Sequence, residues 1–248
     1  MPTILMPLPE TDFDPTESGV PWCILTERGH TVLFATPEGL PARCDERMLE
    51  GTGLGILAPM LRADVHGRLA YEAMAQCPEF RAPLRWEDIK VAQIDAVLLP
   101  GGHAPGMRPY LESEELQMLV AECFRVDKIV AAICHGVLLA ARSNATDETS
   151  VLHERRTTAL LKTQEMLAWT LTFVWLGDYY RTYQVSVQDE VRACLSSPEQ
   201  FVSGPLPLRR DSPQHPEHGF CVRDRNYLSA RWPGDAHRFA LELAAMLG

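Results

Sequence analysis

Residues 95–142 read DAVLLPGGHAPGMRPYLESEELQMLVAECFRVDKIVAAICHGVLLAAR, and this stretch decides the fold. Residues 96–99 and 129–133 are short apolar runs without alternation, which is typical of strands buried on both faces of a parallel sheet. Between them, apolar residues recur at helical spacing over 116–124, and this predicts an amphipathic helix. A strand, a helix and a second parallel strand in this order form a right-handed βαβ unit.

The second strand stops at Cys134, and residues 137–141 resume at once as an apolar helix. A strand that turns straight into a helix exposes its corner residue and needs small neighbours, here Ala132 and Gly136. The pattern therefore predicts a nucleophile elbow with Cys134 as the nucleophile. The helix N-terminus favours the thiolate of Cys134, and His135 adds to this effect. The alternative is a buried structural cysteine.

The bulk properties favour one α/β domain that spans residues 1–248, with 46% hydrophobic residues to build its core. The formal net charge is −10 and no run of Lys or Arg occurs, so we expect no nucleic-acid partner. Seven cysteines without a CxxC pair favour reduced thiols in a cytoplasm. No apolar stretch is long enough for a membrane span. We expect a soluble cytoplasmic protein whose partners are small molecules.

The N-terminal part predicts a strand over 3–6, a helix over 17–28 and a second strand over 31–36. Glu17 falls in the first turn of that helix. This position is at the carboxyl edge of the sheet, where ligands bind in open α/β folds and where the Cys134 elbow opens. The alternative is ordinary helix capping by Asp14 or Glu17.

The intervals of about 40–90 and 173–219 are predicted to be insertions. In the first, residues 63–77 predict a helix interrupted at Gly67, with a lid or a dimer contact as its role. Three of its side chains are expected to face inward: Leu69, Tyr71 and Met74.

The C-terminal half is predicted to contain a strand over 157–160, a helix over 164–172, a hairpin of 220–222 with 227–229, and a closing helix over 235–247. Aromatic residues are frequent between 169 and 183, and aromatic clusters usually form core or interface. We therefore expect the protein to be a homodimer.

Four segments resemble the ThiJ/PfpI family: Asp14-Pro15-Thr16-Glu17, Pro100-Gly101-Gly102-His103, Ala132-Ile133-Cys134-His135-Gly136 and Leu228-Ser229-Ala230-Arg231-Trp232-Pro233-Gly234-Asp235. This family belongs to the class I glutamine amidotransferase-like superfamily, which includes glyoxalase III and Hsp31-type chaperones. The resemblance implies a flavodoxin-like three-layer sandwich with a mostly parallel sheet. It also implies that Glu17 lies against the elbow cysteine.

The resemblance also implies a place for an oxyanion-stabilising glycine, which is Gly102 here, and His135 is the second candidate for this role. His103 is a possible additional site residue. An Asp expected shortly after residues 158–160 is replaced near Lys162, and Glu165 is the nearest substitute. His135 therefore lacks an evident carboxylate partner, which weakens the case for a Cys-His-Asp hydrolase.

Three functions remain open: an enzyme on small reactive carbonyls of the glyoxalase III type, a redox sensor or holding chaperone that uses the same cysteine, and a small amidase or peptidase. We expect neither a cofactor nor a metal. The His215-Pro216-Glu217 tripeptide mimics the His-x-Glu of glutamine amidotransferases, and with His218 it also offers metal donors. No strand precedes it, so a solvated proline-rich loop over 204–218 is the simpler interpretation.

Overall fold

The computed structural model describes residues 1–145 and 148–248. Its main sheet has seven strands in the order β5-β3-β1-β6-β7-β9-β8, and within the described residues each neighbouring pair is parallel except β8 with β9. The strands are β1 (Thr3–Pro7), β3 (Thr31–Thr36), β5 (Leu84–Arg85), β6 (Ala96–Leu99), β7 (Ile129–Ile133), β8 (Cys221–Asp224) and β9 (Tyr227–Ala230). A small second sheet pairs β2 (Thr11–Phe13) with β4 (Arg43–Cys44).

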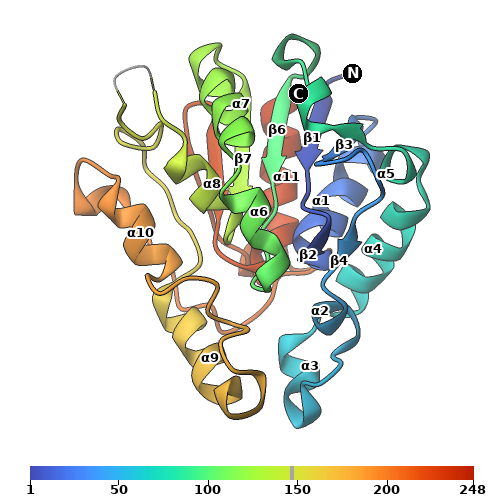
Figure 1. Cartoon of the computed structure of the whole chain (residues 1–248), viewed down its shortest axis with the longest axis vertical. Coiled ribbons are helices and arrows are strands. Elements are labelled where there is room, and N and C mark those ends of the chain that lie inside the picture. The colour runs from blue at the N-terminus through green and yellow to red at the C-terminus, as the bar shows by residue number, and fades with distance from the viewer. Residues whose placement is uncertain (146–147) are drawn as a thin grey trace.

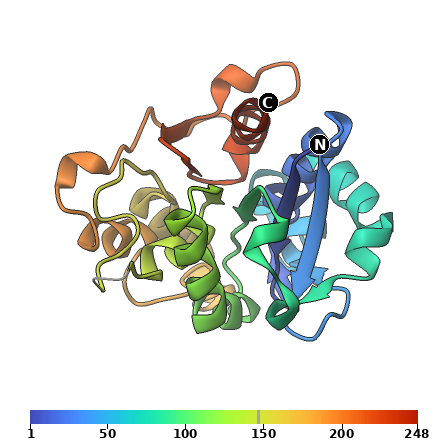
Figure 2. The ribbon, with the colours of Figure 1, turned by 90° about the horizontal axis from the view of Figure 1, so that it is seen from above.

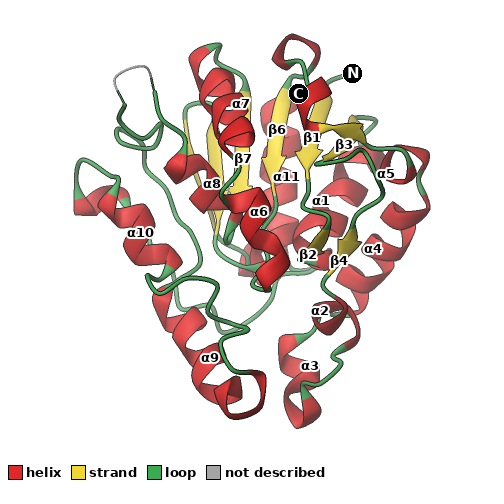
Figure 3. Ribbon diagram, viewed as in Figure 1, coloured by secondary structure: helices red, strands yellow, loops and turns green. Residues whose placement is uncertain are grey.

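Helices cover both faces of this sheet, as Figures 1 and 2 show. One layer holds α1 (Pro15–Glu27), α4 (Val65–Gln76) and α11 (Ala236–Leu247), and the other holds α6 (Arg108–Leu111), α7 (Glu114–Arg125) and α8 (Gly136–Arg142). The strands lie between the two layers in Figure 3. The predicted three-layer α/β fold with a mostly parallel sheet is confirmed.

The remaining helices lie around this sandwich. They are α2 (Glu46–Glu50), α3 (Ala58–Leu61), α5 (Pro78–Arg81), α9 (Lys162–Leu176) and α10 (Val187–Ala193). In Figure 1, α2, α3 and α9 lie beyond the end of the sheet to which the parallel strands point. The predicted insertion of about 40–90 thus places α2 and α3 at the edge where ligands bind in this type of fold. Helix α9 also lies there, although most of it precedes the insertion predicted over 173–219.

The central βαβ unit forms as its pattern predicts. Strands β6 and β7 pair in parallel, and the residues of β6 are buried throughout because helices cover both faces. Ser113 is the N-cap of the connecting helix α7, where its side chain accepts the N–H of Leu116, and two glutamates stand in the first turn of the helix. The Ser113 side chain satisfies an otherwise free amide donor of the first turn, and the two negative charges interact favourably with the positive end of the helix dipole. The hairpin β8–β9 and the closing helix α11 are confirmed as well.

Two predictions about α4 are wrong. The helix runs unbroken through Gly67, because this glycine stands in the first turn, where it lets α4 pack closely on α1. A Cβ at Gly67 would lie 2.5 Å from Thr16 Oγ1, and one at Gly19 would lie 2.6 Å from the Tyr71 nitrogen. Leu69 is 58% exposed, because the buried stripe of α4 runs through Ala70 and Met74.

The strand predicted over 157–160 is also wrong. Thr157 makes one isolated bridge, to Phe201, and the N–H of Thr158 donates to Ser229 Oγ at 2.9 Å. The hydroxyl oxygen of Ser229 thus accepts the backbone N–H that a β-strand would have donated to a neighbouring strand. The helix predicted over 164–172 is confirmed within the longer α9.

Candidate active site

Cys134 occupies a sharp turn between β7 and α8. Its φ is 58°, in the left-handed region that a non-glycine residue rarely adopts. The turn requires Gly136, because a Cβ there would lie 2.1 Å from the carbonyl oxygen of Leu99. Strained backbone of this kind clusters at functional sites, where surrounding packing enforces it. The local geometry is that of a nucleophile elbow.

The environment of the thiol differs from the expected exposed corner. Cys134 is 0% exposed. Burial raises its pKa well above the ordinary value, the charges of Glu17 and Asp14 raise it further, and the backbone N–H of His135 opposes them. These effects on the pKa of Cys134 outweigh the stabilisation of the thiolate by the N-terminus of α8, a helix of seven residues. The expectation of an exposed thiolate is therefore wrong for this conformation, in which the thiol form is favoured.

Glu17 lies beside this thiol and is also fully buried. Its Oε2 accepts the N–H of Gly101 at 2.8 Å, whereas Oε1 has no hydrogen-bond partner within the described part of the chain. Burial raises the pKa of Glu17 well above its ordinary value, the charge of Asp14 adds to this, and the Cys134 thiol partly offsets it. Two neighbouring groups that both resist ionisation hold at most one negative charge between them.

Asp14, and not Glu17, caps the N-terminus of α1. Its Oδ1 accepts the N–H groups of Thr16 and Glu17 at 2.8 and 3.0 Å, so Asp14 is the N-cap of α1. Burial raises the pKa of Asp14 to about 6. The Glu17 carboxyl takes no part in the cap and remains directed at the elbow.

Gly101 fills the space between these groups. A Cβ on Gly101 would lie 2.7 Å from Glu17 Oε2, 2.7 Å from the His135 nitrogen and 3.0 Å from Cys134 Cβ. Only a glycine lets the end of β6 approach the acid and the thiol so closely. The sequence pattern singled out Gly102 and did not assign this role to Gly101.

The N–H groups proposed for an oxyanion come from Gly102 and His135. In the part of the chain that the structure describes, neither donates a hydrogen bond to a protein oxygen. A Cβ at Gly102 would lie 2.5 Å from the Asp12 carbonyl, so this glycine also permits close packing of the loop after β6.

His135 contacts the thiol through Nδ1, which lies 3.5 Å from Cys134 Sγ. Its Nε2 lies 3.2 Å from Thr182 Oγ1, and that hydroxyl donates to the His103 carbonyl at 2.6 Å. A hydroxyl has one proton to donate, so Thr182 accepts from His135 Nε2–H, and Nδ1 presents its lone pair to the thiol. Burial, His103 and Arg142 hold the pKa of His135 well below its ordinary value, which keeps the ring neutral.

Thr182 thus stands where a carboxylate partner of His135 was sought. Glu165 does not take this place, since its Oε2 accepts the N–H of Val187 at 3.0 Å. Burial raises the pKa of Glu165 to about 7. Thr182 lies in the loop after α9, with no local pattern that marks it.

His103 joins the site from the loop after β6. Its ring centroid lies 5.1 Å from that of His135 and 5.1 Å from that of Tyr180. Burial lowers its pKa to about 4, and its Nδ1 has no hydrogen-bond partner among the described residues. His103 is therefore a neutral side chain at the wall of the site.

Two groups of donor atoms in residues 1–145 and 148–248 could hold a metal ion. His103, Cys134 and His135 have donor atoms within 4.8 Å of one another, and a thiol with two imidazoles is a soft set that suits Zn²⁺. The other group is His215, Glu217 and His218 on the proline-rich loop, where His215 Nδ1 pairs with Glu217 Oε1 at 2.9 Å. The absence of a resident metal remains a prediction.

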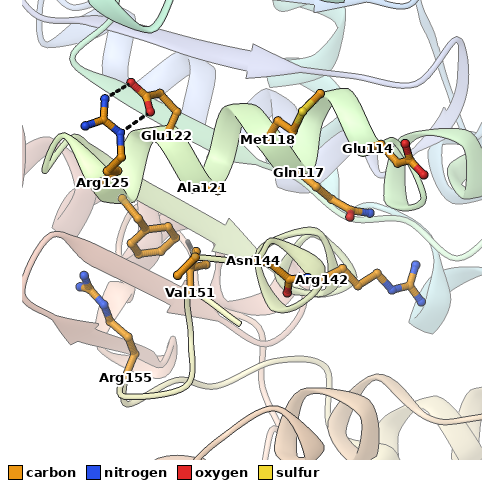
Figure 4. A pocket seen from close by; sticks show the side chains of 12 residues that line it. Glu114, Gln117, Met118, Ala121, Glu122, Arg125, Arg142, Asn144, Val151 and Arg155 are labelled. Atoms are coloured by element: carbon orange, nitrogen blue, oxygen red, sulfur yellow. Dashed lines mark hydrogen bonds and ion pairs between the residues drawn. The ribbon is translucent and has the colours of Figure 1, made fainter. Parts of the chain in front are cut away.

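A cavity of about 610 Å³ lies elsewhere, between α7 and the segments 142–145 and 151–155 (Figure 4). None of the predicted site residues lines it. Glu122 and Arg125 on its rim pair with each other at 2.6 Å. It is separate from the Cys134 site.

A family model described as ThiJ/PfpI family-like matches residues 8–205, and the chain belongs to this family. It is 28% identical over 179 residues to an uncharacterized protein of Schizosaccharomyces pombe, a match that covers 67% of this chain and 66% of that protein. The chain thus spans just under two thirds of that relative's length.

Solved structures share the fold at low identity. Rapid Encystment Protein of Francisella tularensis superposes with a TM-score of 0.71 at 15% identity and covers 100% of both chains. Glyoxalase III from Candida albicans gives 0.61 at 16%, covering 98% of this chain and 96% of that one. DJ-1beta of Drosophila melanogaster gives 0.59 at 15%, covering 99% and 90%. Among the described helices, none has the length and apolar character needed to cross a membrane.

Proposed function

We propose that this chain is a cysteine-dependent enzyme that converts a 2-oxoaldehyde to a 2-hydroxy acid, the glyoxalase III type of reaction. The observation that carries the proposal is the buried pair of Glu17 and Cys134, with a neutral imidazole nitrogen 3.5 Å from the sulfur. Conversion of a 2-oxoaldehyde to a 2-hydroxy acid in this way needs a nucleophilic thiol, a base that accepts the thiol proton, and a carboxyl group that moves a proton between neighbouring carbons. Cys134, His135 and Glu17 have these three capacities.

The first step forms a hemithioacetal. The sulfur of Cys134 bonds to the aldehyde carbon, and His135 Nδ1 accepts the thiol proton. The Glu17 carboxyl gives its proton to the carbonyl oxygen, which leaves Glu17 as a carboxylate. The N–H groups of Gly102 and His135 stabilise the negative charge that develops on that oxygen. Because the ring of His135 is neutral beforehand, it is free to accept this proton.

Glu17 then moves hydrogen from one carbon to the next. Its carboxylate takes the proton from the aldehyde-derived carbon to give an enediol and returns it to the neighbouring carbon, while the hydroxyl proton passes to the second oxygen. The product is a thioester of a 2-hydroxy acid. Water then cleaves the thioester and the acid is released. His135 returns its proton to the sulfur and Glu17 takes one proton of the water, so the net change is addition of one water. No external oxidant or reductant is needed.

The test is purified protein with methylglyoxal, followed for lactate, with Cys134→Ser beside it. Lactate from wild type and none from the variant supports the proposal. A wild-type protein that makes no hydroxy acid from any 2-oxoaldehyde removes it.

The redox sensor is a second candidate, and the unpartnered Oε1 of Glu17 favours it specifically. A protonated carboxyl there could donate a hydrogen bond to a sulfinate formed from Cys134. Ready oxidation of Cys134 to sulfinate without turnover would select this function. The amidase or peptidase alternative is weaker, because a hydroxyl and not a carboxylate supports His135.

We also propose that the protein acts as a homodimer in the cytoplasm. All seven cysteines are unpaired, which suits a reducing compartment. Exposed apolar side chains on α9, among them Phe173 and Trp175, offer area for a self-contact. Light scattering at micromolar concentration tests the dimer, and a monomer there would contradict it.

A further inference from the structure

A second cavity lies next to the Cys134 site, with a volume of about 450 Å³. This is within the range of small-molecule pockets, roughly 300–1,000 Å³. His103 and Asp14 stand in its wall, and the same His103 contacts the ring of His135. The cavity therefore adjoins the catalytic groups, and the His103 side chain stands between the two.

The cavity has a buried polar end and an exposed apolar end. Asp14 and His103 are more than nine-tenths buried, whereas Leu167 is 59% and Leu208 is 82% exposed. Side chains of α3, α9 and the 205–210 loop supply the apolar walls, and α3 and α9 lie beyond the carboxyl edge of the sheet in Figure 1. Such a gradient fits an amphipathic molecule whose polar end enters first.

The polar end carries hydrogen-bonding atoms that the protein leaves unused. Within the described residues, His103 Nδ1, Arg210 Nη1 and Trp232 Nε1 are buried without a partner, and all three residues line this cavity. Arg210 Nη1 and Trp232 Nε1 can only donate hydrogen bonds. A buried donor without a partner is destabilising, and a ligand oxygen that accepts its hydrogen bond would remove this cost. Arg210 also lies over the Trp232 ring at 5.5 Å, which holds both donors together.

We infer that the cavity binds the body of the substrate, and that the substrate is a 2-oxoaldehyde with an unbranched apolar chain of medium length rather than methylglyoxal. This inference rests on the proposed function and deepens it. The oxygen-bearing end lies at Arg210 and Trp232, in the cavity wall where His103 adjoins the Cys134 site, and the chain runs outward along Leu167 and Leu171 of α9. A three-carbon substrate leaves the apolar walls uncovered.

The kinetic test compares methylglyoxal, 2-oxohexanal and 2-oxooctanal on wild type. Each methylene that becomes buried raises kcat/KM by up to about fourfold, so 2-oxooctanal exceeds methylglyoxal by at least about tenfold. Leu171→Arg puts a charge on the apolar wall and lowers this ratio of kcat/KM values to near one. The matched control is Val174→Arg on the same helix, since Val174 is 78% exposed and does not line the cavity. Equal kcat/KM values for all three aldehydes, or equal effects of the two variants, overturn the inference.

A binding test separates this inference from the proposed function. Titration of Cys134→Ser with 2-hydroxyoctanoate and with lactate, followed by tryptophan fluorescence, gives at least tenfold tighter binding of the longer acid, and Leu171→Arg abolishes the difference. If no aldehyde is turned over but this preference holds, the proposed reaction fails and the binding site stands. If methylglyoxal is turned over and neither longer compound is preferred, the inference alone fails. Binding of an unfolded polypeptide in place of 2-hydroxyoctanoate makes the cavity a chaperone surface and also overturns the inference.

Discussion

Thr182→Val is the sharpest test of the site, because one hydroxyl sets the tautomer of His135. The substitution keeps the shape of the side chain but removes two contacts, the 3.2 Å contact with His135 Nε2 and the 2.6 Å bond to the His103 carbonyl. A buried N–H left without an acceptor costs roughly 1–3 kcal/mol. The competing tautomer, with the proton on Nδ1, escapes this penalty by donating toward Cys134 Sγ.

The magnitude follows from that penalty. Each 1.36 kcal/mol corresponds to about a factor of ten, so the fraction of His135 that can accept the thiol proton falls roughly 5- to 150-fold. We expect kcat/KM for a 2-oxoaldehyde to fall by the same factor, and we expect the rate of Cys134 alkylation at neutral pH to fall with it.

Thr182→Ser is the control, since it retains the hydroxyl and should restore both rates to within a few-fold of wild type. Circular dichroism and denaturation verify that both variants fold. If Thr182→Val keeps kcat/KM within twofold of wild type while folded, the hydroxyl does not orient His135 and the reasoning is refuted.

Three further outcomes are expected. Glu17→Gln leaves Cys134 open to alkylation but lowers lactate production on the order of a hundredfold or more, because an amide cannot carry a proton between carbons; full production by this variant would contradict the assignment. Gly136→Ala places a Cβ 2.1 Å from the Leu99 carbonyl, and the forced backbone shift lowers the free energy of unfolding by roughly 1–3 kcal/mol in urea titration. A variant as stable as wild type would show that the elbow tolerates a side chain. Treatment with EDTA leaves turnover unchanged, whereas added Zn²⁺ inhibits it reversibly by binding Cys134 with His103 and His135; loss of activity on chelation would reveal a required metal.

The central part of the fold could be predicted from the sequence because its determinants are local. Apolar runs without alternation marked β6 and β7, and the abrupt change from strand to helix at Cys134 marked the elbow. The strand over 157–160 could not be predicted correctly, because Ser229, more than seventy residues away, supplies the acceptor for Thr158. Local propensity holds no information on such a partner.

Site residues could be predicted from the sequence where they stand at the end of a helix or a strand. Glu17 follows the N-cap Asp14, and Gly101 accepts the Asp14 N–H at 2.8 Å, so the start of α1 and the end of β6 meet at one place. The burial of Cys134 was not predictable, because the segments that cover it come from distant parts of the chain. Thr182 was missed for the same reason, since it reaches His135 across 47 positions.

The acid sensitivity of folding tests the burial of the neutral histidines. The folded pKa of His103 is about 4, below the unfolded value of 6.5, so its contribution to stability is present above pH 6.5 and is lost as the pH falls toward 4. Between pH 7.5 and pH 5 this amounts to about 2 kcal/mol. His135, whose pKa is also lowered, acts in the same direction, whereas Asp14, whose pKa is raised to about 6, acts in the opposite one. His103→Gln removes one titrating group and leaves the other two, so the free energy of unfolding of the variant relative to wild type should rise by about 2 kcal/mol between pH 7.5 and pH 5. Urea titrations of both proteins at the two pH values measure this difference. If the difference between the two proteins is the same at both pH values, His103 is not a buried neutral imidazole, and its place in the wall of the site must be revised.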